Sequence, residues 1–342
     1  MLAMGSLGWT ADRFGRRAYL VAVPYAFGIG VVGLAAVGSF AALVAVFVVL
    51  YAAAGLYDVG INAVAVDLER LSERGLMSFL HASYAAGAVA GALGAGALLS
   101  AGVGYRTVYL AVLIPLSAVL LAFLATRLPH GDRAAGSPPG PEGGDAPTGT
   151  APGRWGVYGS APLLLVAAIA GLGFVSEGVM ERWSAIYLRD TLGLGAMVGG
   201  SGVAVFFGAM AAGRLGTGWL VTRLGNRRTL QAAGLLAAAG MAVALLTTRP
   251  PIVVAGFLLV GLAISGMAPL AQSMAGGLFP DRAGAAVSVV ITFGSGGGLL
   301  ATVAVGGVAE WAGLRTALGL VVAAGLAVFA LSLRRDRDGG SG

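Results

Sequence analysis

Long apolar stretches separated by short polar breaks run through almost the whole sequence. Each stretch has roughly 20 residues or more, which is enough to cross the hydrocarbon core of a bilayer as a helix. Glycine, proline or a charged residue marks the breaks, as expected at helix ends. The pattern predicts an all-α, polytopic membrane protein with complete transmembrane helices. The ten predicted segments are residues 18–38, 41–68, 77–101, 105–127, 159–188, 196–221, 228–248, 251–276, 283–309 and 314–333.

Two of the polar breaks carry the same short motif. The first, Gly8 to Arg17, is Gly-Trp-Thr-Ala-Asp-Arg-Phe-Gly-Arg-Arg. The second, Gly218 to Arg227, is Gly-Trp-Leu-Val-Thr-Arg-Leu-Gly-Asn-Arg, and it shares Gly, Trp, Arg, Gly and Arg in register with the first. A motif that returns after this long an interval, from Gly8 to Gly218, predicts two related halves, each with a tight cytoplasmic loop between two membrane helices.

The first motif resembles the loop between helices 2 and 3 of the major facilitator superfamily. The second resembles the matching loop between helices 8 and 9, although Thr222 replaces the acid and Asn226 replaces a base. The resemblance covers essentially the whole chain and implies the major facilitator fold, with two pseudo-symmetric helical halves. Residues 1–7 resemble the end of the second helix, so we expect helix 1 and most of helix 2 to be missing from the numbered chain.

A Gly- and Pro-rich stretch interrupts the apolar pattern at residues 129–153, which include six prolines and seven glycines. Such a composition cannot bury enough apolar surface to fold, so it predicts a disordered linker. The resemblance places this stretch where the family joins its two halves. The predicted organisation is therefore an incomplete N-terminal helical half at 1–128, a cytoplasmic linker at 129–155, and a C-terminal helical half with a short tail at 156–342.

Charged residues are sparse and unevenly distributed. They make up 11% of the chain, about half of what a soluble domain carries, and all 21 basic residues are arginine. Fifteen arginines fall on one side of the predicted helix array, four on the other and two inside helices. The positive-inside rule then places the linker and the C-terminus in the cytoplasm and the protein in the plasma (cell inner) membrane. The rule also explains the basic balance without nucleic acid, which we do not expect as a partner.

Asp58 lies deep inside the predicted segment 41–68, roughly 16 Å from its cytoplasmic end by helical rise. An ionisable group at this depth costs at least ~2.5 kcal/mol on insertion scales, so it needs a partner or a water-filled cavity. Asn62 follows one turn later on the same face. We therefore predict that Asp58 binds and releases a proton near neutral pH and that Asn62 lines the cavity. A buried Asp that only hydrogen-bonds a neighbouring helix is the alternative.

The Asp-x-x-x-Asn arrangement is similar to an acid-x-x-x-Asn arrangement in the fourth helix of the fucose:proton symporter branch. There the acid is a Glu implicated in proton coupling, and the resemblance implies that role for Asp58. His81, at the start of the next predicted helix, matches a polar position of that branch and is a candidate to bind substrate or relay a proton. A helix-end histidine bonded to a backbone carbonyl explains it equally well.

The second half holds further candidates. Glu177 lies near mid-membrane, shares a helix face with Glu181, and is the second predicted proton-coupling residue. Trp183 is a candidate for the substrate cavity, with interfacial anchoring as the alternative. Gln272 follows Pro269, which is expected to bend its helix, and is predicted to face the cavity.

The first motif also has a mechanical role by resemblance. Asp12, Arg13 and Arg16 would form a latch that holds the outward-open state. Asp12 would meet the positive N-terminal end of a helix in the second half, and Arg16 would pair with Asp67 or Glu69. The alternative is that these basic residues only set the topology.

These observations predict a non-enzymatic secondary transporter, proton-coupled, that moves a small polar solute, such as a sugar, by alternating access. Two histidines and no cysteine give no metal-ligand cluster, and no phosphate-binding motif suggests ATP, so we expect no metal and no cofactor. The expected partners are the solute, protons and the lipid bilayer, with the protein as a monomer. Two alternatives stay open: a proton-driven exporter of amphipathic compounds, and a truncated, non-transporting membrane sensor or accessory protein.

Overall fold

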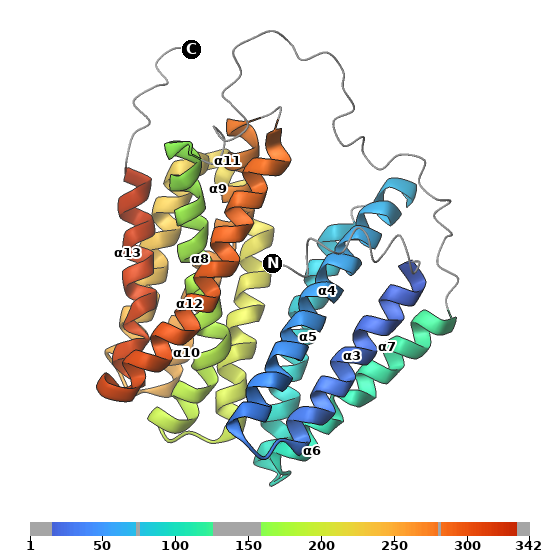
Figure 1. Cartoon of the computed structure of the whole chain (residues 1–342). Coiled ribbons are helices and arrows are strands. Elements are labelled where there is room, and N and C mark those ends of the chain that lie inside the picture. Colours follow the sequence, from blue (N-terminus) through green and yellow to red (C-terminus); the bar gives the residue numbers. More distant parts are fainter. Residues whose placement is uncertain (1–15, 73–75, 126–158, 280–281, 334–342) are drawn as a thin grey trace. The chain divides into compact units, whose positions relative to one another are not determined.

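The computed structural model describes residues 16–72, 76–125, 159–279 and 282–333 (Figure 1). Side chains are described within these ranges except at residues 16–20, 58–60, 62–72, 76–82 and 283–285. Every regular element of the described part is a helix, which confirms the predicted all-α class. The predicted linker at 129–155 lies entirely outside the described residues, so the proposed division into two halves stays a prediction.

The chain divides into two compact units, residues 1–83 with 101–149 and residues 84–100 with 150–342. In the first unit, α3 (Arg16–Ala36) packs on α4 (Phe40–Ser72), α6 (Tyr105–Ala111) and α7 (Leu113–Ala125). Val23 and Ala53 are buried in this contact. Only Val112 separates α6 from α7, and it keeps αR backbone angles (φ −62°, ψ −25°), so the predicted segment 105–127 forms one apolar helical stretch over Tyr105–Ala125.

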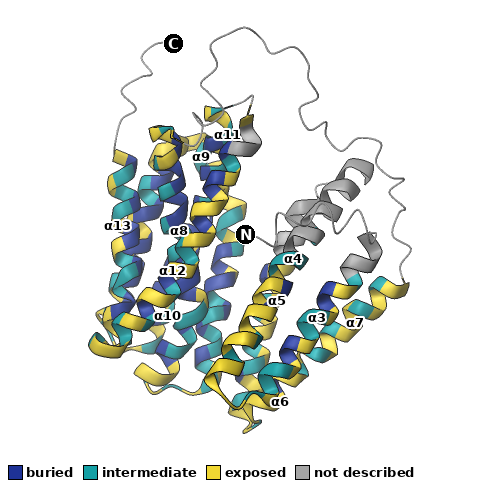
Figure 2. Ribbon diagram, in the orientation of Figure 1, coloured by how far each residue is buried: buried dark blue, intermediate teal, exposed yellow. Residues whose placement is uncertain are grey.

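In the second unit, α8 (Ala161–Ile186) occupies the centre and contacts all its main helices. It continues directly into the π-helical turn η1 (Tyr187–Thr191). The other helices are α9 (Ala196–Leu245), α10 (Pro250–Ile264), α11 (Met267–Leu278), α12 (Ala283–Ala317), α13 (Gly319–Leu333) and the second part of α5 (Leu76–Ser100). Figure 2 shows many buried residues along α8. Large apolar side chains of α12, among them Leu299 and Trp311, are exposed, as expected of a surface that faces lipid.

Two glycines with positive φ produce the breaks that the sequence predicts near residues 221–228 and 309–314. Gly225 has φ 79° and ψ 162° and divides α9 into two legs. Gly313 has φ 79° and ψ 155° near the end of α12. Only glycine adopts this backbone conformation without strain, so both tight turns depend on it.

Pro269 explains a third break, inside the predicted segment 251–276. The helix stops at Ile264 and restarts at Met267, which places Pro269 in the first turn of α11. Proline has no N–H to donate to the carbonyl one turn earlier, so the chain interrupts the helix there. The regular helix is therefore interrupted at Ser265 and Gly266, although both keep αR backbone angles and the two parts form one apolar stretch.

Seven helical stretches of the described chain are long and apolar enough to cross a membrane, and two shorter apolar helices cover residues 21–36 and 319–333. One of the seven is α9, whose two legs are separate apolar segments. The described residues therefore contain the ten apolar segments that the sequence pattern predicts.

Candidate substrate and proton site

Close backbone packing between α8 and α12 fixes the helix that carries Glu177. A Cβ atom added to Gly297 would lie 2.7 Å from the Gly171 carbonyl oxygen, and one added to Gly294 would lie 2.5 Å from the Phe174 ring. A Cβ on Gly178, next to Glu177, would lie 3.3 Å from the Gly298 carbonyl oxygen. Small residues permit this approach between helices in lipid, and they hold α8 in one orientation.

Glu177 is half-buried on α8, among charged groups from two helices. Its carboxylate interacts electrostatically with Arg214 of α9 and, on its own helix, with Glu181 and Arg182. Arg214 and Arg182 thus bring positive charge near Glu177 and Glu181, as charges within membrane-spanning helices require. The structure thus supplies Glu177 with an opposite charge from a neighbouring helix.

Arg182 turns toward its own helix. Its guanidinium lies 3.6 Å from the Glu181 carboxylate and donates a hydrogen bond of 3.2 Å to the Gly178 carbonyl. The structure thus pairs Arg182 with an acid of its own helix. Arg182 and Glu181 are both partly exposed, so this contact is a modest one.

Arg214 lies on the first leg of α9, within a membrane-spanning stretch. Its Nη2 donates to the Met210 sulfur at 3.8 Å, and among the described residues no carboxylate oxygen lies within 4.0 Å of it. A thioether is a weak acceptor for a cation. Arg214 and Glu177 therefore attract one another across the α8–α9 contact without a direct ion pair.

Trp183 lies one and a half turns beyond Glu177 on α8. Its ring packs against the core of the second unit and approaches Gly306 of α12, where an added Cβ would lie 3.7 Å from the indole. The indole Nε1 is buried and has no hydrogen-bond partner among the described residues, and the same is true of the neighbouring Ser184 hydroxyl. A buried N–H does not suit an interfacial anchor, which keeps its polar edge in the headgroup region.

Gln272 is half-buried on α11, and its place in a substrate cavity stays a prediction. The remaining predicted site residues lie outside the described residues: Asp12 and Arg13 entirely, and Arg16 as regards its side chain. Asp58, Asn62, Asp67 and Glu69 belong to the α4 backbone and His81 to that of α5, but their side chains are likewise undescribed.

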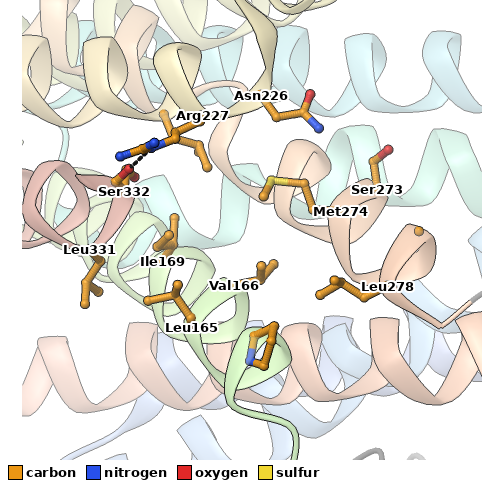
Figure 3. A pocket seen from close by; sticks show the side chains of 13 residues that line it. Leu165, Val166, Ile169, Asn226, Arg227, Ser273, Met274, Leu278, Leu331 and Ser332 are labelled. Atoms are coloured by element: carbon orange, nitrogen blue, oxygen red, sulfur yellow. Dashed lines mark hydrogen bonds between the residues drawn. The ribbon is translucent and has the colours of Figure 1, made fainter. Parts of the chain in front are cut away.

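A cavity of about 330 Å³ lies between α8, α11, α13 and the start of the second leg of α9 (Figure 3). Arg227 at its wall donates to the Ser332 carbonyl at 2.6 Å and to the Leu333 carbonyl, and Gln231 donates to the same Ser332 carbonyl at 2.9 Å. Both side chains thus cap the C-terminal end of α13. Neither Glu177, Trp183 nor Gln272 lines this cavity, so we assign it no transport role.

Sequence reasoning missed these tertiary caps. It used the arginines near turns only to assign topology, but Arg315 donates to the Tyr187 hydroxyl at 3.3 Å and to the Thr247 carbonyl at 3.2 Å. A basic side chain next to a turn is the signal that was present in the sequence. The two acceptors of Arg315 lie 68 and 128 residues away in the chain, and no local sequence pattern identifies them.

Comparisons with known proteins agree with this architecture. The sequence profile of the Major Facilitator Superfamily matches residues 1–217 and, in a second match, 183–342. An uncharacterized MFS-type transporter of Yersinia pestis is 30% identical over 321 residues, covering 94% of this chain and 79% of its own. The membrane protein MosC of Rhizobium meliloti is 27% identical, covering 98% and 79% of the two chains.

A solved structure shares the fold. The MFS transporter FucP, in the outward conformation, superposes with a TM-score of 0.52 over 97% of this chain and 86% of its own, at 14% identity. At this identity the likeness concerns the fold alone. It confirms the helical architecture that the sequence pattern and its resemblance predict.

Proposed function

Because this chain belongs to the Major Facilitator Superfamily, we propose that it is a proton-coupled secondary transporter that moves a small polar solute by alternating access. Membership of this family makes it a membrane transporter. The proton coupling and the class of solute are our proposals. The observation that supports them is the placement of an acid, Glu177, and a base, Arg214, on two neighbouring membrane-spanning helices, α8 and α9.

The charge arrangement around Glu177 suits a proton carrier. Arg214 attracts the ionised carboxylate, but no direct ion pair holds the two side chains together. Protonation of Glu177 would therefore remove one negative charge from this group of charged side chains, and Arg214 would lose the nearby negative charge of Glu177. A solute with hydrogen-bonding groups, or a rearrangement of α8 against α9, can then supply the missing interaction. Protonation and solute binding are coupled through this shared cation.

Trp183 is the proposed solute-binding side chain on the same helix. Its N–H has no acceptor among the described residues, and a buried donor without an acceptor is costly. In our proposal this N–H and the Ser184 hydroxyl gain partners at another stage of the transport cycle. Asp58, Asn62, His81 and Gln272 remain the other proposed coupling and cavity residues, the proposed location is the plasma membrane, and the linker and C-terminus are proposed to face the cytoplasm.

Proteoliposomes with an imposed inward proton gradient test the proposal. The neutral probes are radiolabelled L-fucose and D-glucose, and ethidium is the amphipathic probe. Gradient-driven sugar uptake that falls at least tenfold in Glu177→Gln supports the proposal, with Glu181→Gln as the matched control on the same helix face. Proton-driven movement of ethidium alone supports the exporter instead. Uptake that keeps its dependence on the gradient in Glu177→Gln contradicts the assignment of Glu177.

A further inference from the structure

Ser100, at the end of α5, caps a helix to which it does not belong. Its hydroxyl oxygen accepts a hydrogen bond of 2.9 Å from the backbone N–H of Met197, in the first turn of α9. The N-cap residue of α9 is Gly195, which has no side chain that can accept this bond. The first N–H groups of a helix have no partner within the helix, so Ser100 provides from 97 residues away what an N-cap side chain normally provides.

Two glycines bring Ser100 within reach. A Cβ on Gly96 would lie 3.1 Å from the Ala196 carbonyl oxygen, and a Cβ on Gly200 would collide with the Ala92 carbonyl oxygen. The backbones of α5 and α9 are therefore in direct contact over about a turn and a half next to the capping bond. We call this contact, formed by Ala92, Gly96, Ser100 and residues 196–200, the α5–α9 seam.

The seam joins segments that alternating access has to separate. By sequence, α5 belongs to the predicted N-terminal half and α9 to the predicted C-terminal half. The capping bond lies at the ends of these helices that adjoin residues 101–104 and 192–195, on the arginine-poor side that we propose to be external. Opening the transporter to the outside would draw the two helices apart at this end and leave the Met197 N–H without its acceptor.

We propose that Ser100 is a positioning residue of the transport cycle, whose hydroxyl caps α9 across the α5–α9 seam and favours the state closed to the outside. This inference rests on the alternating-access mechanism in the proposed function. It needs neither a particular solute nor a proton-coupling residue. Loss of an N-cap side chain shifts an equilibrium by about fivefold, which is enough to change the populations of two transporter states.

The chain contains no cysteine, so a single introduced thiol reports on the seam without background. Val203 is a suitable position, because it lies one turn after Gly200 on α9, is half-buried, and packs against the core. Cells carrying Val203→Cys are treated from outside with a membrane-impermeant maleimide. We expect Ser100→Ala to raise the labelling rate about fivefold and Ser100→Thr, which keeps the hydroxyl, to stay within twofold of the parent.

Ser39→Ala is the matched control. The Ser39 hydroxyl accepts from the Ala42 N–H at 3.3 Å, so it caps α4 within its own segment and takes no part in the seam. We expect the control to leave Val203→Cys labelling unchanged. Equal labelling in Ser100→Ala and the parent overturns the proposal, and so does an equal rise in Ser39→Ala. Ser100→Asp, a cap that also carries the charge favoured at a helix N-terminus, should lower the rate and provides a second test if Ser100→Ala folds poorly.

The labelling assay separates this inference from the proposed function, because it uses no solute and no proton gradient. Faster labelling in Ser100→Ala together with no transport of any probe supports the seam and counts against proton-coupled transport. Unchanged labelling together with gradient-driven sugar uptake overturns the role of Ser100 and leaves the transport proposal standing.

Discussion

Two glycine-rich helices of the second unit behave differently. On α12, Gly294 and Gly297 lie against α8, where an added Cβ would meet a ring or a backbone carbonyl. On α5, Gly87 and Gly91 repeat every four residues, as a close-packing face would, but no atom of the described residues lies within 4 Å of an added Cβ. The spacing of small residues thus shows that a helix face can pack closely. Only a partner helix decides whether it does.

The α5–α9 seam sharpens this contrast on a single helix. Among the described residues, no atom lies within 4 Å of a Cβ added to Gly87, Gly91 or Gly94 of α5. The contact uses Gly96 and the Ala92 carbonyl instead. The physical reason is that the partner helix begins at Ala196 and reaches only the C-terminal end of α5 with its first turns.

The largest effect is expected where glycine meets backbone. Gly297→Ala would place a methyl group 2.7 Å from the Gly171 carbonyl oxygen, and backbone cannot move aside as a side chain can. We expect a loss of about 1–3 kcal/mol in unfolding free energy, as for an overpacked core. Unfolding in a denaturing detergent measures it. Gly296→Ala, on the same helix with no described atom within 4 Å, is the control and should lose nothing.

Removing a tertiary cap should have an intermediate effect. Arg227→Gln takes away the charge-assisted donors to the Ser332 and Leu333 carbonyls at the end of α13. Loss of this cap should cost about 1 kcal/mol, because Gln231 still donates to Ser332. The same detergent titration checks it. Arg228→Gln, whose side chain is exposed on the next residue, should be nearly neutral, and an equal loss there would contradict the capping role.

The open glycine face of α5 should respond in the opposite direction. Gly91→Ala adds a methyl group where the described structure leaves room and replaces a poor helix former by the best one. We expect a gain of up to about 0.5–1 kcal/mol in unfolding free energy. A marked loss of stability would mean that this face packs against a helix after all.

The smallest effect is expected at the partly exposed ion pair on α8. Glu181→Gln removes the charge 3.6 Å from Arg182. Pairs with this exposure contribute about 0–1 kcal/mol, so unfolding should change very little. Unfolding of Glu177→Gln should be compared in parallel, because Glu177 is more shielded and interacts with Arg214 on another helix. A larger change for Glu181 than for Glu177 would reverse this ranking.

Much of the fold could be predicted from the sequence because membrane helices depend on local properties. Apolar length identified the segments, Gly225 and Gly313 marked two turns, and Pro269 marked the break between α10 and α11. The site was predictable in part for the same reason. An acid such as Glu177 inside an apolar helix is conspicuous, whereas its interaction with Arg214 depends on how α8 and α9 are rotated against each other.

The amino-acid sequence by itself therefore determined the helical class, the apolar segments, their turns and the presence of charges at membrane depth. These features follow from hydropathy and backbone chemistry within a few residues. Only the tertiary structure decided that Ser100 caps α9, that Arg227 caps α13, and that the glycines of α12 rather than Gly87 and Gly91 of α5 meet a neighbouring backbone. Those contacts join residues far apart in the chain, and they form only when two complete helix faces fit together.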